Sequence, residues 1–203
     1  MKGRFVKLII FLLSSSIVIK AQDFSLGFSL ESNAVKINQE GKSLPLYASI
    51  FGLRVNSGID FNKTLSLEAR SAVDFGPEYF TGTEIGLLIK YSFADPFYMS
   101  AGLINHKVSK MVNSTDEILP WYSNNANLIM PALAVGVSLP VKKDGNGSGR
   151  YNIELMYLNA FNKEIGIGSY LWDDGLPHPA VVIMKPLKLA YALKLSIGVS
   201  LYL

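Results

Sequence analysis

The chain has 203 residues, of which 49% are hydrophobic, 17% charged and 11% aromatic. This length suits a single domain, and the apolar content is high enough for a folded core, so a disordered chain is excluded. There is no cysteine, which excludes disulfides, thiolate zinc sites and cysteine nucleophiles.

The first 21 residues have the pattern of a signal peptide. Lys2, Arg4 and Lys7 form a basic start, an apolar run follows over residues 8–19, and Ala21 is the small residue expected before a cleavage site. The apolar run is too short to cross a bilayer as a helix, which needs about 20 residues. We therefore expect this segment to direct secretion and to be removed.

The mature chain is then residues 22–203, and its charge differs from that of the precursor. The leader carries four basic residues and no acidic one, which leaves 15 basic and 16 acidic side chains in the mature chain. Nucleic-acid binding needs a basic surface, so we expect no nucleic-acid partner.

From residue 23 onward, large apolar side chains recur at every second position, the period of a β-strand with two different faces. In residues 64–75, Leu67 and Val73 share one face, and Glu68 and Arg70 lie on the other. The last 17 residues repeat this pattern, with Leu187, Leu189, Leu193 and Ile197 on one face and Lys188 and Lys194 opposite. The pattern predicts eight strands, at residues 23–32, 47–61, 64–75, 80–93, 97–106, 129–141, 150–160 and 187–203.

The predicted connections tend to alternate between short and long. The longest are residues 33–46, 107–128 and 161–186, and they separate strands that are otherwise joined by tight turns such as Asn62-Lys63 and Asp95-Pro96. This rhythm is typical of a barrel with short periplasmic turns and long outer loops. The predicted fold is all-β: an eight-stranded antiparallel up-and-down transmembrane β-barrel that forms one domain.

The composition of the two faces decides between a membrane barrel and a soluble one. A soluble carrier barrel places large apolar side chains inside and charged ones outside. Here one face is bulky and apolar, whereas the other mixes charges with small residues such as Gly86, Ala132 and Gly136. Small and charged residues fit the narrow lumen of an eight-stranded barrel, and an apolar outer face fits lipid. We expect the apolar face to point outward.

This layout resembles the small eight-stranded outer-membrane barrels of Gram-negative bacteria, the OmpA, OmpX and OmpW type, over residues 23–203. Ser196, Gly198, Leu201 and Leu203 resemble the assembly signal of that class, although the family pattern usually ends on Phe or Trp. The resemblance implies a bacterial outer-membrane location and insertion by the barrel-assembly machinery. It also implies a monomer in contact with outer-membrane lipids and lipopolysaccharide.

Charged residues on the inner face are nearly balanced. They are the acidic Glu31, Asp60, Glu68, Asp74, Glu84 and Glu154 and the basic Arg54, Arg70, Lys90, Lys188 and Lys194. An unpaired charge in a poorly hydrated interior costs several kcal/mol, so we expect these groups to form ion pairs. The predicted centre of this lumen network is Arg54, Glu68, Arg70, Glu84, Glu154 and Lys194. The alternative is a polar path for small solutes that opens when the pairs rearrange.

Enzymatic chemistry has weak support. His106 is followed by Ser109, with Asp116 and Glu117 in the next loop, but known barrel deacylases place the histidine two residues before the serine. A lone histidine at the mouth of the lumen is the simpler interpretation. We expect no catalytic residues and no cofactor.

One loop resembles half of a calcium site. Asp144, Asn146, Ser148 and Gly149 match the first positions of a calcium-binding loop, but the twelfth position is Leu155 instead of glutamate. A flexible turn explains the same residues, and we expect no metal site there.

The expected role is therefore structural or surface-interacting and non-enzymatic. Trp121, Tyr122, Tyr170 and Trp172 in the long loops form either a contact patch for a partner or part of an interfacial aromatic girdle. One alternative function is a narrow, porin-like channel or carrier for small solutes, hydrophobic ones included. A lipid-modifying enzyme is the disfavoured third option.

Overall fold

The computed structural model describes residues 23–39, 42–75, 80–109, 112–113, 121–123, 126–141, 148–172 and 181–202. The predicted signal peptide lies outside these residues. The strands are β1 (Asp23–Gln39), β2 (Lys42–Asp60), β3 (Leu65–Asp74), β4 (Gly82–Ala94), β5 (Phe97–Val108), β6 (Val112–Asn113), β7 (Trp121–Ser123), β8 (Asn127–Val141), β9 (Ser148–Trp172) and β10 (Val181–Tyr202).

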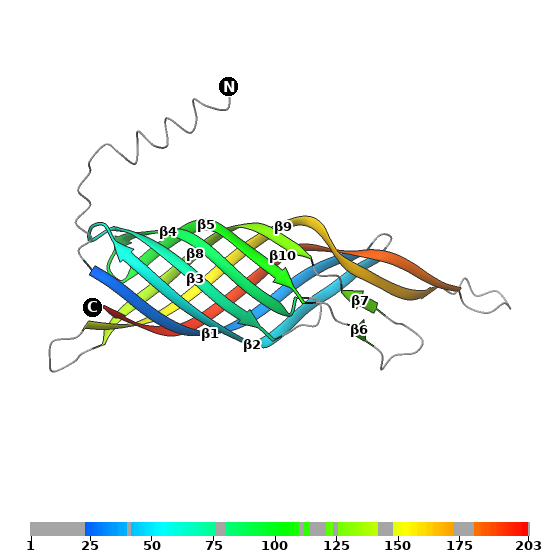
Figure 1. The fold of residues 1–203 in the computed structure, drawn as a ribbon, viewed down its shortest axis with the longest axis horizontal. Coiled ribbons are helices and arrows are strands. Elements are labelled where there is room, and N and C mark those ends of the chain that lie inside the picture. Colours follow the sequence, from blue (N-terminus) through cyan, green and yellow to red (C-terminus); the bar gives the residue numbers. More distant parts are fainter. Residues whose placement is uncertain are drawn as a thin grey trace, which may run out of the picture.

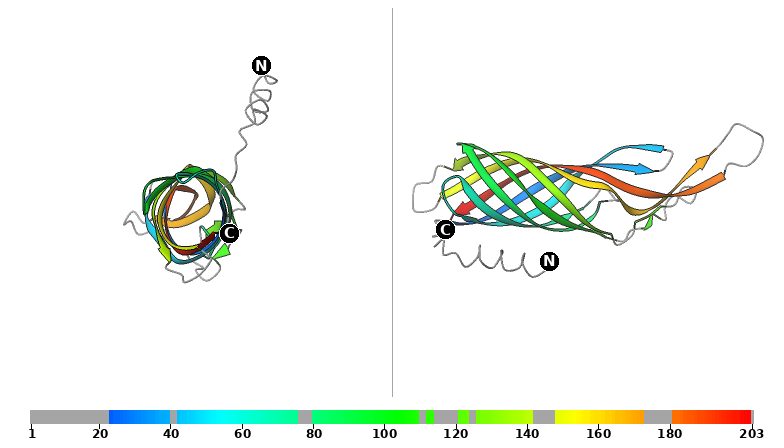
Figure 2. Two further views of the ribbon diagram at one scale, coloured as in Figure 1. Left: turned by 90° about the vertical axis from the view of Figure 1, so that its left-hand side faces the viewer. Right: turned by 90° about the horizontal axis from the view of Figure 1, so that it is seen from above.

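Eight of these strands close into a barrel. Each of β1, β2, β3, β4, β5, β8, β9 and β10 pairs antiparallel with the next, and β10 also pairs with β1, which closes the ring. Figure 1 shows the tilted strands from the side, and Figure 2 shows the closed ring end-on. The predicted fold class is confirmed. None of the described residues forms a helix that is long and apolar enough to cross a lipid bilayer.

The two faces point in the predicted directions. Along β3, Glu68 and Arg70 are buried in the lumen, and along β10, Lys194 is buried while Leu195 and Ile197 face outward. Bulky apolar side chains therefore cover the outside, and charges line the inside. A soluble carrier barrel would have the opposite arrangement and is excluded.

Short turns close the end of the barrel at which β1 begins and β10 ends; we call this the terminal end. In the β2–β3 turn, the side-chain oxygen of Asn62 accepts hydrogen bonds from the backbone N–H groups of Thr64 and Leu65, both at 2.8 Å. The β4–β5 turn is Asp95-Pro96. Both turns were predicted from their residue types.

Strand lengths differ from the prediction at the opposite end, which we call the loop end. Residues 33–46 and 161–186 were predicted to be loops, but β1 pairs with β2 as far as Gln39 and Lys42, and β9 pairs with β10 as far as Trp172 and Val181. Both hairpins extend beyond the barrel (Figure 2). Strands outside the bilayer need no apolar outer face, so the alternation that marks membrane-facing strands is absent there. The predicted loop 107–128 contains β6 and β7, and β7 pairs with β9.

A β-bulge corrects a second prediction. The pairing of β9 with β10 shifts between Leu189 and Tyr191, so the faces of β10 exchange at Ala190. Leu187 and Leu189 are consequently buried in the lumen, and Lys188 is exposed, the reverse of the predicted orientations. A period-two pattern assigns the wrong face to every residue beyond a single inserted residue.

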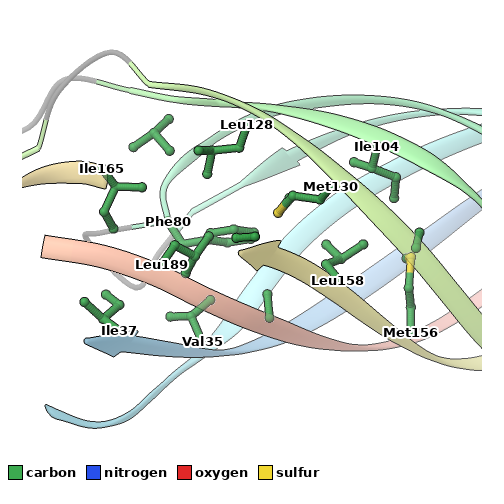
Figure 3. Close-up of a cluster of buried hydrophobic side chains, with 14 of the residues drawn as sticks. Val35, Ile37, Phe80, Ile104, Leu128, Met130, Met156, Leu158, Ile165 and Leu189 are labelled. Atoms are coloured by element: carbon green, nitrogen blue, oxygen red, sulfur yellow. The ribbon is translucent and has the colours of Figure 1, made fainter. Parts of the chain in front are cut away.

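An apolar layer fills the lumen toward the loop end. Along β1, β9 and β10 the buried residues change from small and polar at the terminal end, through charged, to apolar at the loop end. Figure 3 shows this cluster. Its larger members are Val35, Ile37, Phe80, Leu88, Ile104, Val108, Leu128, Met130, Met156, Leu158, Ile165, Leu187 and Leu189.

Candidate functional site

The first part of the lumen site is centred on Glu154 of β9. Arg70 of β3 donates to both of its carboxylate oxygens, at 2.7 Å each, and Arg54 of β2 donates to Oε1 at 2.9 Å. The Tyr98 hydroxyl donates to Oε2 at 3.2 Å. Arg70 also contacts Glu68 at 2.6 Å. Two-pronged arginine–carboxylate pairs are directional, so this arrangement holds strands from opposite sides of the barrel in one geometry.

The second part of the site is centred on Lys194 of β10. Its Nζ lies 2.7 Å from Glu84, 2.9 Å from Asp74 and 3.2 Å from Glu31, which come from β4, β3 and β1. Asn33 donates to Asp74 from the neighbouring position on β1. The ammonium group is almost completely removed from solvent, and three carboxylates replace its hydration shell.

Glu31 joins the two parts into one network. Its Oε1 lies 3.0 Å from Arg54, while its Oε2 faces Lys194. Lys90 lies beside the network, with its Nζ 3.9 Å from the centroid of the Tyr98 ring, a cation–π contact. The network crosses the whole lumen, because its members come from β1, β2, β3, β4, β9 and β10.

All six residues predicted as the centre of the network are buried and take part in these ion pairs. Sequence reasoning placed Glu31 and Asp74 on the inner face but outside that centre, because the predicted strands ended next to them. β1 extends to Gln39, so Glu31 lies in the middle of a strand. A first strand predicted to continue through residues 33–39 would have placed Glu31 near the middle of the barrel instead of at a strand end.

His106 is not a lone histidine at the lumen mouth. Its side chain is 0% exposed, its Nδ1 lies 2.9 Å from Glu84 Oε1, and its ring stacks on Phe80 at 4.0 Å between centroids. Ser109 is exposed, whereas the imidazole is enclosed by the lumen. The imidazole is therefore closed to solvent by the residues that the structure describes.

Asp74, Glu84 and His106 meet the geometric requirement for a metal site, since one ligand atom of each lies within 4.8 Å of the others. The Lys194 ammonium, however, contacts both carboxylates. A metal ion would have to displace a buried cation that already neutralises these groups, so the residues fit an ion-pair cluster better than a metal centre.

A polar vestibule of about 600 Å³ lies at the terminal end. It is lined by polar and charged side chains, including Asp60, Lys90 and Arg150, and Arg150 forms an ion pair with Asp95 at 2.7 Å. A second cavity, next to Arg54, Arg70 and Glu154, measures only about 20 Å³. Open space therefore decreases sharply where the charge network begins.

Among the residues of the predicted assembly signal, Ser196 is buried, Gly198 half-buried and Leu201 exposed, and Leu203 lies outside the described residues. The half-motif at residues 144–149 and the side chains of Trp121, Tyr122, Tyr170 and Trp172 also fall at least partly outside the described part of the chain.

The outer surface is apolar around the ring between the two ends. Aromatic side chains lie near both edges of this belt: Phe24, Phe93, Phe97 and Tyr151 toward the terminal end, and Phe51, Phe75 and Phe161 toward the loop end. Phe80, in contrast, points into the lumen. A closed antiparallel barrel with an apolar belt, aromatic rims and an ionic lumen defines a transmembrane β-barrel.

Solved structures with a similar fold include outer-membrane proteins. Outer membrane protein AlkL in lipid bilayers is 12% identical with a TM-score of 0.47, over 89% of this chain and 90% of that one. The N-terminal β-barrel domain of Pseudomonas aeruginosa OprF is 13% identical with a TM-score of 0.44, over 86% of this chain and 97% of that one. OprG from the same organism is 11% identical with a TM-score of 0.44, over 91% and 97%. No family model and no curated protein matches this chain.

Proposed function

We propose that this protein is a bacterial outer-membrane barrel with a structural or surface-interaction role and no enzymatic activity. The observation that carries the proposal is the filled lumen. The charge network crosses it from wall to wall, and the apolar layer lies between that network and the loop end. A solute crossing the barrel would have to break several buried ion pairs and then displace packed apolar side chains.

The extended hairpins support a role at the cell surface. β1–β2 and β9–β10 both extend past the barrel at the loop end, and β7 adds to the edge of β9. In this proposal the loop end faces outward and the short turns face the periplasm, which follows the usual loop lengths of outer-membrane barrels. Insertion by the barrel-assembly machinery, a monomeric state and removal of residues 1–21 belong to the same proposal.

Two measurements test this function. Purified protein in planar lipid bilayers is expected to give no steady channel openings, and openings of regular size would overturn the closed-lumen proposal.

In cells, the protein is expected in the outer-membrane fraction, with gel mobility that changes on boiling because folded barrels resist SDS. Equal mobility before and after boiling, or recovery in the soluble fraction, would overturn the membrane location.

A carrier for hydrophobic solutes is the second candidate, and one observation favours it. The ladder between β8 and β9 ends at Ala132 and Leu158, and β9 next pairs, with β7, from Gly166. Between these points the described residues of β8 (127–131) and β9 (159–165) are not paired with each other. This break lies beside the apolar layer, so it is the place where an apolar molecule would enter the barrel from the side.

A reversible cross-link tests the carrier. The chain has no cysteine, so two can be introduced as a specific pair. Pro131 and Asn159 lie one position beyond the last β8–β9 pair, on the side of the loop end, and P131C together with N159C is designed to place a disulfide across the break. If the break is a route, vesicles containing this variant take up a hydrophobic fluorescent amine such as N-phenylnaphthylamine only after reduction. Uptake equal to that of protein-free vesicles in both redox states would exclude the carrier.

A further inference from the structure

The outer wall near the loop end has an ordered change from apolar to polar side chains. In the register of β4, β5 and β8, Leu87, Leu103 and Pro131 form one outward row. The next row toward the loop end is Ile85, Asn105 and Ile129, and the row after that is Thr83, Lys107 and Asn127. All nine side chains are exposed. Within two rows, the outer wall thus changes from side chains that suit the hydrocarbon core of a bilayer to side chains that suit the lipid headgroups.

The apolar side of this boundary carries some of the most exposed hydrophobic side chains described. Ile85 is 70% exposed, Ile129 64% and Phe161, on the neighbouring strand β9, 68%. Ile85 and Ile129 flank Asn105 in one outward row, so the three apolar side chains line the edge of the belt around a single polar position. Such a surface is satisfied by acyl chains.

Two lysines stand on the polar side of the boundary. Lys107 is paired with Asn127 in the β5–β8 ladder, and Lys163 of β9 donates from Nζ to the Asn127 carbonyl oxygen at 2.7 Å. This contact is possible because β8 and β9 are not paired there, so the carbonyl is free to accept. Lys107 of β5 and Lys163 of β9 therefore lie on either side of the end of β8, one row beyond Ile129.

Neither lysine has a carboxylate partner within the described part of the chain. The adjacent Glu164 is exposed and stands opposite Lys188 of β10 in the register. The terminal end differs, because its exposed Asp95 is paired with Arg150 and its rim also carries Asp23 and Lys63. The lysine pair is thus an uncompensated positive site at one edge of the apolar belt.

We propose that Lys107 and Lys163 bind the phosphate of a phosphorylated glycolipid of the outer leaflet, with its acyl chains against Ile85, Ile129 and Phe161. This proposal rests on the membrane location and orientation proposed above. A phosphomonoester carries a charge of about −1.5 to −2 at neutral pH, which matches two lysines better than the single charge of a phosphodiester. The occupant is therefore a lipid with a terminal phosphate, and an ordinary phospholipid is the competing outcome.

Native mass spectrometry of the purified barrel tests the site. Bisphosphorylated lipid A, phosphatidylglycerol and phosphatidylcholine are titrated separately against the wild type, the double variant K107Q/K163Q and the matched control K63Q/K188Q. The control removes the same charge from the terminal end and from another strand at the loop end. We expect lipid A to bind the wild type most tightly, and we expect K107Q/K163Q to lose about fivefold in affinity per lysine, with little change in the control.

Three results would overturn the proposal: an equal loss of lipid A binding in both double variants, no loss in either, or tighter binding of phosphatidylglycerol than of lipid A. Boiled and unboiled gel mobility of all three proteins establishes that they are folded. If the wild type fails that test or is not recovered in the outer membrane, the proposed membrane function fails. If it passes and lipid A binding is insensitive to the lysine pair, the lysine site alone fails.

Discussion

At the scale of single residues, the buried charges hold the barrel together because most of them have partners on other strands. Glu154 accepts from Arg54, Arg70 and Tyr98, so one carboxylate connects β9 to β2, β3 and β5. Burying charged groups is itself costly, so the network need not add much net stability relative to an apolar lumen. Removing one member, however, leaves its buried partners without a counter-charge, as the two guanidinium groups would be without this carboxylate.

We expect Glu154→Ala to lower the free energy of unfolding by about 3–5 kcal/mol, since two buried arginines lose their shared acceptor. Urea unfolding in lipid vesicles, followed by the gel-mobility shift, measures this change. Glu164→Ala removes an exposed carboxylate from the same strand and should alter stability by less than about 0.5 kcal/mol. Similar losses in both variants would show that the network does not couple the strands.

Glycine marks places where strands approach too closely for a side chain. A Cβ added at Gly102 would lie 2.1 Å from the Leu87 carbonyl oxygen and 2.7 Å from the Leu88 Cα, and these backbone atoms are held by the β4–β5 ladder. Gly102→Ala is expected to destabilise the folded barrel by about 1–3 kcal/mol. At Gly149 the nearest atoms would be at 3.6 Å, so Gly149→Ala serves as the tolerated control in the same urea titration. A larger loss for Gly149→Ala would contradict the packing argument.

At the scale of elements, the sequence predicts strands reliably where lipid contacts one face and charges line the other. The alternation of Leu67, Glu68 and Arg70 has a single physical cause, so the assignment of β3 is nearly correct. It fails where that cause is absent, in the hairpins beyond the belt, and where a bulge at Ala190 reverses the face of β10. The ion pairs across the lumen were anticipated as a group. The contact of His106 with Glu84 joins directly paired residues of β4 and β5, and it was not predicted because the sequence alone placed His106 at the end of its strand.

The face reversal at Ala190 makes a direct prediction for two adjacent residues. Leu189 is buried in the apolar layer, so Leu189→Ala should cost about 2–5 kcal/mol of unfolding free energy through a cavity in the lumen. Lys188 is exposed, so Lys188→Ala should cost less than about 0.5 kcal/mol. Vesicle-based urea unfolding distinguishes the two, and the opposite ranking would restore the uninterrupted alternation expected from sequence.

At the scale of the whole molecule, the barrel is divided into three regions with different tasks. The terminal end has short turns and an open polar vestibule, the middle is cross-linked by ion pairs, and the loop end is filled by apolar side chains below the extended hairpins. Along the β9–β10 ladder, the outermost described members of the apolar layer are Ile165 and Leu187, and the pairs from Ser169–Met184 to Trp172–Val181 lie beyond them. The outer part of the β9–β10 hairpin should therefore be separable from the folded barrel.

Ser169 and Met184 face each other in the β9–β10 ladder, so an Asn-Gly turn in place of residues 170–183 closes the hairpin without changing the register. This shortened protein should keep the wild-type urea midpoint and gel-mobility shift. A longer deletion that joins Glu164 to Lys188, which also face each other, removes Ile165 and Leu187 from the apolar layer and should unfold at lower urea. Because the hairpin end is expected to serve surface contacts only, loss of stability in the shorter deletion would mean that it supports the barrel instead.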